Sequence, residues 1–151
     1  NLIKKLNVSD VVKLHGTVPN SEIVRRMRDS DIFLFTSDRR EGWGAVLNEA
    51  MSNGCVAISS DSIGATPYLI EHNKNGLIFE SNNLKSLLEQ TKYLLNNPLE
   101  REKMSVSAYE TMREVWSPAN VAKQFLELVS YLLGESNYIP ISGPCSKSEM
   151  K

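Results

Sequence analysis

Two acids and two glycines in the stretch EGWGAVLNEAM could together bind a ligand that carries both phosphates and hydroxyl groups. Seven residues separate Glu41 from Glu49, and Gly42 and Gly44 lie just after the first acid. Because glycine has no side chain, a phosphate or a sugar could approach the backbone closely there. A helix that begins at these glycines would also present unbonded N–H groups and about half a positive charge at its amino end. The pattern therefore favours an anion site.

The two acids need a separate explanation, because a carboxylate repels a phosphate. The expected donors to the anion are the backbone N–H groups at the start of the helix, which belong to Gly44, Ala45, Val46 and Leu47. Glu41 would then accept hydrogen bonds from sugar hydroxyls, and Glu49, on the helix face opposite the core, from a ribose diol. In the alternative interpretation, Glu41 caps the helix and Glu49 is an ordinary surface acid.

Predicted strands and helices alternate around this stretch. Short apolar or β-branched runs predict strands at residues 11–16, 32–37, 56–59 and 77–79, and helices are expected between them from Ser21, from the glycines and after Gly64. This alternation predicts an α/β fold, a Rossmann-like doubly wound parallel sheet with helices on both faces. Ligands of such folds bind at the carboxyl ends of the strands. The glycines follow the run IFLFTS, which is expected to be buried on both faces.

Three more helices are predicted beyond the last strand. The first is expected to turn one set of residues inward, namely Leu84, Leu87, Leu88, Thr91 and Leu94 or Leu95. The other two begin at cap pairs, Asn97 with Pro98 and Ser117 with Pro118, and Trp116 is expected to pack the last helix down. We expect one domain over residues 1–133 and a disordered tail over residues 134–151, where apolar periodicity is lost.

Composition excludes several functional classes. The 151 residues carry a formal net charge of −1, so the overall charge does not attract nucleic acid. No apolar run approaches the roughly 20 residues that span a bilayer, and the first residues lack the apolar centre of a secretion signal. Cys55 lies in an apolar run and Cys145 in the polar tail, so no disulfide is expected. A cytoplasmic setting is therefore expected.

Several blocks of the chain, in order, resemble the carboxy-terminal domain of retaining glycosyltransferases of family 4. DIFLFTS precedes the EGWGAVLNEAM signature, NEAMSNGCVAISSD overlaps its end, and IGATPYLIEHNKNGLIF and WSPANVAKQFLELV follow. These enzymes have the GT-B fold, in which two Rossmann-like domains face each other and the second binds a nucleotide diphosphate sugar. The resemblance implies that this chain is that donor-binding domain, from an enzyme of bacterial surface polysaccharide synthesis.

The resemblance also assigns each site residue to one part of the donor. By this resemblance Glu41 is the catalytic residue and binds hydroxyls of the transferred sugar, and Glu49 binds the ribose. The sugar and distal phosphate would be bound by Gly42, Trp43 and Gly44, and the diphosphate by Ala45, Val46 and Leu47. The base would be bordered by Gly16 and Thr17. The family holds the diphosphate without a metal or other cofactor, so neither is expected here.

Two departures from the family pattern limit these implications. The family has a Gly pair followed by Pro and Glu after the third strand, whereas this chain has Ala65 and Tyr68 in place of the second Gly and the Glu. The family's Arg and Lys that neutralise the departing diphosphate have no counterpart before Val11, and its amino-terminal acceptor domain is missing. We therefore expect this part alone to transfer nothing. Its expected partners are a nucleotide sugar, the missing acceptor domain and a glycan or lipid-linked acceptor, with the inner membrane face as a further candidate.

Other signals have simpler alternatives. Asp29 and Asp31 have the spacing by which another glycosyltransferase fold binds a divalent metal, but they fall at the amino end of a strand, so a structural role is favoured. For His15 an ordinary structural role is favoured, and a loop position near the base is the alternative. Arg39 and Arg40 adjoin the signature and could either contact the diphosphate or be solvated. Two other functions stay open: a non-catalytic nucleotide-sugar-binding module and a GT-B sugar-nucleotide epimerase.

Overall fold

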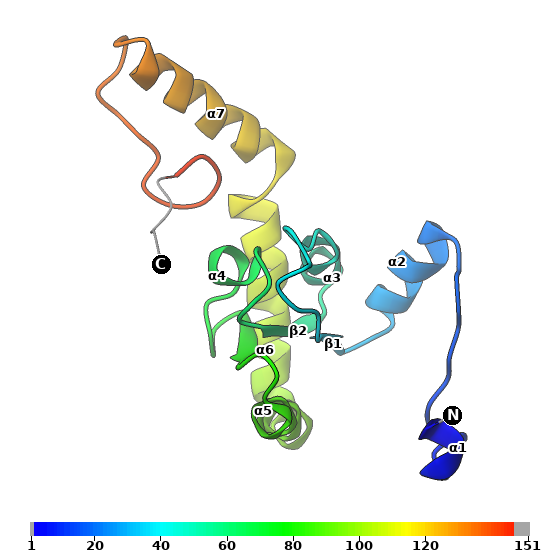
Figure 1. Cartoon of the computed structure of the whole chain (residues 1–151). Coiled ribbons are helices and arrows are strands. Elements are labelled where there is room, and N and C mark those ends of the chain that lie inside the picture. Colours follow the sequence, from blue (N-terminus) through cyan, green and yellow to red (C-terminus); the bar gives the residue numbers. More distant parts are fainter. Residues whose placement is uncertain (1, 147–151) are drawn as a thin grey trace.

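The computed structural model describes residues 2–146. Its elements in chain order are α1 (Leu2–Lys5), α2 (Asn20–Arg28), β1 (Ile32–Phe35), α3 (Val46–Ser52), β2 (Val56–Ser60), α4 (Thr66–Leu69), β3 (Gly76–Phe79), α5 (Leu84–Asn96), α6 (Pro98–Glu110), the π-helical turn η1 (Thr111–Val115) and α7 (Pro118–Leu132). Figure 1 shows the small sheet at the centre with α3, α4, α5 and α6 around it, and α1, α2 and α7 farther out.

The sheet is parallel and runs in the order β1-β2-β3. Ile32 of β1 lies opposite Val56 of β2, and Ile58 of β2 lies opposite Leu77 of β3. Helix α3 connects the first two strands and α4 the second two. This arrangement confirms the predicted α/β fold with a Rossmann-like parallel sheet. The loops before α3, before α4 and after β3 all leave the sheet at its carboxyl edge.

Helices cover both faces of the sheet, as predicted. Successive residues of a strand point to opposite faces, and β2 shows this directly. Val56 and Ile58 belong to a core cluster with Leu94 of α5 and Met104 of α6. Ala57, between them, belongs to another cluster, which also holds residues of α3, α4 and η1, among them Leu47, Met51, Leu69 and Met112.

The predicted strand at residues 11–16 is not present in the structure. The segment lies before α2 without strand pairing, and Val11 and Leu14 are 75% and 76% exposed. A strand needs a neighbour for its N–H and C=O groups. In the common doubly wound order 3-2-1-4-5-6, neighbours in chain order such as β1, β2 and β3 correspond to strands 4, 5 and 6. The preceding strand 3 would then be separated from β1 by two further strands, and no described segment fills that space.

Strand β1 is consequently an edge strand, which the sequence did not predict. Phe35 is buried, but Leu34 is 46% exposed, so the run IFLFTS is not covered on both faces. Helix α5 shows a similar difference. Leu94 is buried and Leu87 packs against the core, whereas the other leucines predicted to face inward are exposed: Leu84, Leu88 and Leu95.

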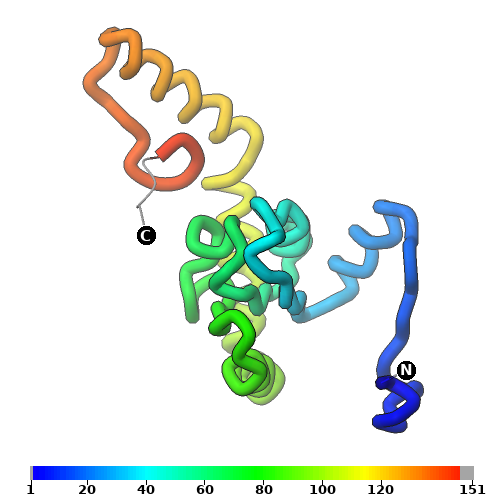
Figure 2. The backbone as a smooth tube through the Cα atoms, in the orientation of Figure 1, coloured from blue at the N-terminus to red at the C-terminus, as the bar shows by residue number. Residues whose placement is uncertain are grey.

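The two ends of the described chain extend away from the sheet (Figures 1 and 2). Helix α7 begins as predicted, with Ser117 Oγ accepting a hydrogen bond from Asn120 N at 3.3 Å, and none of its residues is buried. Residues 135–146 form neither helix nor strand, and Gln124 Nε2 of α7 donates to Ser142 O at 3.4 Å. The expected disorder of the tail stays a prediction, and residues 147–151 lie outside the described part. Within residues 2–146, no helix is long and apolar enough to cross a bilayer.

Candidate functional site

Helix α3 begins where the glycines predict, and most of the expected donors are available. Ala45 is the N-cap, and the helix starts at Val46. Leu47 N donates to Gly44 O at 2.9 Å, so the prediction of a free Leu47 N–H is wrong. The tight turn that places Gly44 before the helix satisfies this group early. Among the hydrogen bonds of residues 2–146, none uses the N–H groups of Gly44, Ala45 or Val46.

Gly44 is held by its backbone conformation and by packing. Its φ angle is +83°, a region that side chains other than glycine rarely adopt. A Cβ atom at this position would lie 2.8 Å from Phe35 Cε1 and 3.0 Å from Ile63 Cγ2. The loop therefore turns directly over the end of β1, and no other residue fits at this point.

A second loop, between β2 and α4, is attached to the glycine loop. Ala65 N donates to Trp43 O at 2.9 Å, and a Cβ atom on Gly64 would collide with the carbonyl oxygen of Gly42. The sequence did not predict this contact, because the departures from the family pattern at Ala65 and Tyr68 left the role of the loop at Gly64 open. The signal that could have revealed it is Gly64 itself, since a glycine in such a loop often marks a close backbone approach.

The two acids lie on either side of the start of α3. Glu41 directly precedes the glycine loop, and Glu49 lies in the first turn of the helix. Glu41 is partly buried and Glu49 is exposed. Among the hydrogen bonds and ion pairs of the described residues, neither carboxylate has a partner. Helix α3 has no side-chain cap, so the alternative in which Glu41 caps the helix is wrong. Both carboxylates remain available to a ligand.

Gly16 and Thr17 are not brought to this loop. Both are exposed, and in Figure 1 the extended segment that contains them lies on the far side of α2 from α3. The neighbouring His15 has a structural contact, since its Nε2 lies 2.8 Å from Arg26 Nη1 of α2. A role for Gly16 and Thr17 beside the base stays a prediction.

A polar cavity of about 690 Å³ opens at the carboxyl edge of the sheet, beside the glycine loop. Its lining residues come from the segments that follow the three strands and are Asp38, Arg39, Arg40, Asp61, Ser62, Glu80, Ser81 and Asn82. A cavity of about 280 Å³ shares part of this lining and reaches down to Ser60 and Phe79. Parallel sheets bind ligands at this edge. The sequence prediction did not include Asp61 or the residues after β3.

Arg40 and Asp38 form an ion pair at the rim of this cavity. Arg40 Nη2 lies 2.7 Å from Asp38 Oδ2, and the hydrogen bonds from the Arg40 side chain lower the pKa of Asp38 to about 2. The pair is therefore ionised at neutral pH. Arg39 is exposed and has no such partner among the described residues, so it is the freer of the two cations beside the signature.

The acids Asp29 and Asp31 lie at the opposite edge of the sheet. They border a cavity of about 550 Å³ at the amino end of β1, and Asp29 Oδ2 accepts from Arg25 Nη1 at 2.7 Å. In the described part of the chain, no three His, Cys, Asp or Glu side chains gather where they could hold a metal ion. Their position agrees with the structural role that the sequence favoured.

Cys55 is a core residue, as predicted. Its side chain is buried beside Met27 and Ala50, which join α2 to α3. The Sγ donates to Met27 O at 3.0 Å, and burial raises the pKa of the thiol. A thiol that stays protonated is a poor nucleophile, so Cys55 has no place in the candidate chemistry.

A glycine loop, a helix amino end and two carboxylates lie at the carboxyl edge of a parallel sheet, where proteins of the Rossmann-like class bind their ligands. Residues 1–111 match the family model described as glycosyl transferases group 1. The chain belongs to this family.

Solved structures share its fold, and two of them illustrate the likeness. The carboxy-terminal domain of LpcC, a glycosyl transferase group 1 family protein from Francisella tularensis, superposes with a TM-score of 0.71 at 23% identity, over 78% of this chain and 60% of that one. HepE from Anabaena, solved in complex with UDP, superposes with a TM-score of 0.74 at 22% identity, over 85% of this chain and 35% of that one. These likenesses confirm the Rossmann-like fold of GT-B enzymes.

A curated relative is closer in sequence. The amylovoran biosynthesis glycosyltransferase AmsK of Erwinia amylovora is 37% identical over 86 residues, which are 54% of this chain and 21% of AmsK. The matched curated relatives are all much longer than the match, and this chain covers between 14% and 27% of their lengths.

Proposed function

We propose that the chain is the donor-binding part of a retaining, metal-independent glycosyltransferase of family 4. The observation that carries this proposal is the glycine loop. It presents the N–H groups of Gly44, Ala45 and Val46 between two carboxylates, Glu41 and Glu49, that have no partner in the described chain. Such an arrangement suits a diphosphate with a sugar at one end and a ribose at the other.

Each group then has one task. The N–H groups of Ala45 and Val46 bind the diphosphate, and that of Gly44 faces the distal phosphate. Glu41 binds hydroxyls of the transferred sugar and is the catalytic residue. Glu49 accepts two hydrogen bonds from the ribose diol. Glycine at positions 42 and 44 keeps side chains away from the sugar and phosphate.

The donor is a nucleotide diphosphate sugar, and UDP sugars are the first candidates. HepE, which shares the fold, has been solved with UDP and with UDP-glucose. AmsK is by name an enzyme of amylovoran biosynthesis, which supports a role in bacterial surface polysaccharide synthesis. We place the enzyme on the cytoplasmic side of the membrane, acting on a glycan or a lipid-linked acceptor.

The described chain needs a further part to complete this activity. Strand β1 is an open edge of the sheet with Leu34 exposed, and the apolar residues Val11 and Leu14 have no covering partner in the described chain. An open edge and apolar segments of this kind favour more strands beside β1. We infer that these strands and an amino-terminal acceptor domain belong to the same enzyme, and that residues 1–151 alone transfer no sugar.

Amide chemical shifts of the isotope-labelled 151-residue chain test the donor site. On addition of UDP or UDP-glucose, the largest shifts are expected at Gly44, Ala45 and Val46, because their N–H groups would meet the diphosphate. If neither ligand shifts these amides, the proposed donor site is wrong.

Substitution of the two acids separates their roles. Glu49→Ala should weaken binding of both UDP and UDP-glucose about tenfold, because it removes charge-assisted hydrogen bonds to the ribose. Glu41→Ala should weaken UDP-glucose about tenfold and leave UDP unchanged. Dissociation constants from titration calorimetry measure both effects, with Glu110→Ala, another exposed acid, as the control. Equal losses on the two ligands for Glu41→Ala would contradict this division.

A further inference from the structure

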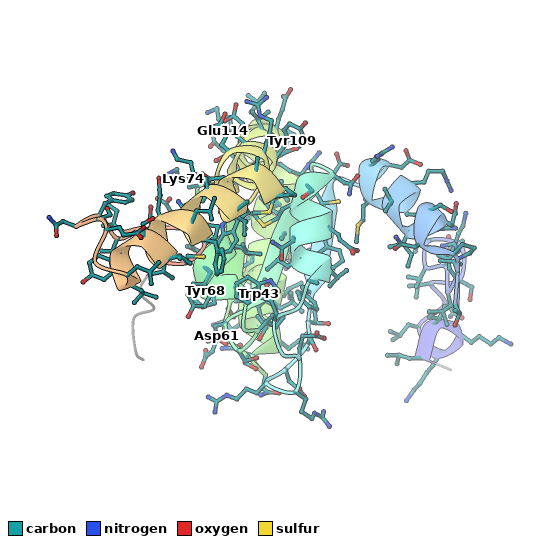
Figure 3. All side chains as sticks on the ribbon, turned by 90° about the horizontal axis from the view of Figure 1, so that it is seen from above. Trp43, Asp61, Tyr68, Lys74, Tyr109 and Glu114 are labelled. Atoms are coloured by element: carbon teal, nitrogen blue, oxygen red, sulfur yellow. The ribbon has the colours of Figure 1, made fainter. Side chains whose placement is uncertain are left out.

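Three aromatic side chains from separate segments form a cluster beside the glycine loop. Trp43 belongs to the loop itself, Tyr68 to α4, and Trp116 is the C-cap of η1. The Trp43 ring centroid lies 5.6 Å from that of Tyr68, at an interplanar angle of 32°, and 5.8 Å from that of Trp116, at 48°. Figure 3 labels Trp43 and Tyr68, whose side chains lie next to each other.

Only one member of the cluster is packed into the core. Trp116 is partly buried and packs against the core cluster on the α3 and α4 face, which contains no residue of α7, so its predicted packing on the last helix stays a prediction. Trp43 and Tyr68 are 42% and 47% exposed and belong to none of the core clusters. Adjoining exposed aromatic rings are unfavourable in water, and such patches mark binding surfaces.

The Trp43 ring is fixed in place before any ligand arrives. The ring Nε1 of Trp43 donates to Asn48 Oδ1 at 2.9 Å, and the backbone carbonyl oxygen of Trp43 accepts from Ala65 N at 2.9 Å. Gly44, the next residue, is locked by its positive φ angle and by Phe35. A ring that is already ordered loses little entropy on binding, so this surface is organised in advance.

The position of the rings indicates the chemistry of the ligand. Trp43 lies two residues after Glu41, whose carboxylate has no partner in the described chain. The face of an aromatic ring carries partial negative charge, which attracts the C–H bonds on the apolar face of a pyranose. A carboxylate beside such a face accepts hydrogen bonds from the hydroxyls at the ring's edge.

We infer that the surface formed by Trp43 and Tyr68 is a stacking platform for a pyranose ring of a sugar substrate. This inference rests on the proposed function and deepens it, because it adds a specificity-determining surface to the donor site. Tyr68 occupies the position where the family pattern has a Glu, so the platform distinguishes this chain from relatives that keep the acid there. The stacked ring belongs either to the donor sugar or to an acceptor sugar, which have the same stacking chemistry.

Substitution of Tyr68 tests the platform in the 151-residue chain. The probes are the UDP-hexoses UDP-glucose, UDP-galactose and UDP-N-acetylglucosamine. Tyr68→Ala should weaken the binding of at least one of them about three- to tenfold. Binding of UDP alone should change less than about twofold, because UDP has no pyranose. Tyr109→Ala is the matched control, since Tyr109 on α6 is 46% exposed and joins no aromatic pair in the described chain. Trp43→Leu, which keeps an apolar side chain, should repeat the effect of Tyr68→Ala.

Tryptophan fluorescence identifies the source of the sugar. The chain contains two tryptophans, so Trp116→Phe leaves Trp43 as the reporter. Quenching by UDP-hexose but not by methyl α-glucopyranoside would indicate the donor sugar. Quenching by the glucoside that is lost in Tyr68→Ala would indicate an acceptor sugar.

The outcomes separate this inference from the proposed function. If the wild-type chain binds UDP, but Tyr68→Ala and Trp43→Leu leave every UDP-hexose affinity unchanged and Tyr68→Ala does not change the quenching by methyl α-glucopyranoside, the platform is wrong and the donor site stands. If Tyr68→Ala and Trp43→Leu weakened the binding of UDP and of UDP-hexoses equally, the two rings would only support the loop. This result would also overturn the platform. If the wild-type chain binds neither UDP nor any UDP-hexose, the proposed function fails and the platform fails with it.

Discussion

Gly44→Ala is expected to lower the free energy of unfolding by about 2 to 5 kcal/mol. About 1 to 2 kcal/mol comes from forcing a side chain into the left-handed region, since φ is +83°. The remainder, about 1 to 3 kcal/mol, comes from overpacking, because the added Cβ would press on Phe35 and Ile63. Both neighbours are buried in the core, so neither can move aside freely. Urea denaturation followed by circular dichroism measures the change.

A control variant separates the two contributions. Gly134 also has a positive φ angle, +75°, but a Cβ atom there would meet nothing within 4 Å. Gly134→Ala should therefore lose only the conformational part, no more than about 2 kcal/mol. If Gly44→Ala were no more destabilising than Gly134→Ala, the close packing of the glycine loop over the end of β1 would be refuted.

Gly64→Ala is expected to separate the two loops that form the candidate site. The added Cβ would collide with the carbonyl oxygen of Gly42, which is backbone and cannot rotate away. The hydrogen bond from Ala65 N to Trp43 O would then lengthen or break. We expect a loss of about 1 to 3 kcal/mol in the free energy of unfolding. The Trp43 fluorescence should also change and UDP should bind at least about tenfold more weakly, because misplacing the loop misplaces its N–H groups.

The opposite partner of the same contact supplies the control. A Cβ atom on Gly42 would meet nothing within 4 Å, and its φ angle is not positive. Gly42→Ala should leave the stability and the Trp43 emission close to those of the wild-type chain. Wild-type stability and UDP affinity in Gly64→Ala would show that the two loops are independent.

Features that depend on neighbouring residues could be predicted from the sequence. The start of α3 at the glycines, its end near Asn53 and the Ser117 cap of α7 were predicted correctly. Helix capping and apolar periodicity are short-range properties, because they arise within one or two turns of chain. The alternation of such elements was also enough to predict the parallel α/β fold.

Features that depend on partners distant in the chain could not be predicted in this way. Residues 11–16 have the composition of a strand, but a strand forms only beside another strand, and no strand of residues 2–146 lies there. Leu34 is exposed for the same reason, since β1 has a described neighbour on one side only. Leu47 N was predicted free, but it donates to Gly44 O because the turn before the helix closes more tightly than an ideal first turn.

By itself, the sequence determined which groups are present at the candidate site, namely two acids, the glycines between them and a helix that begins with free N–H groups. The glycines had to follow a strand and start a helix, and that requirement is local. Only the tertiary structure decided what surrounds these groups. It placed Gly64 and Ala65 against the loop and Tyr68 beside Trp43, because the carboxyl ends of neighbouring parallel strands meet at one edge of the sheet.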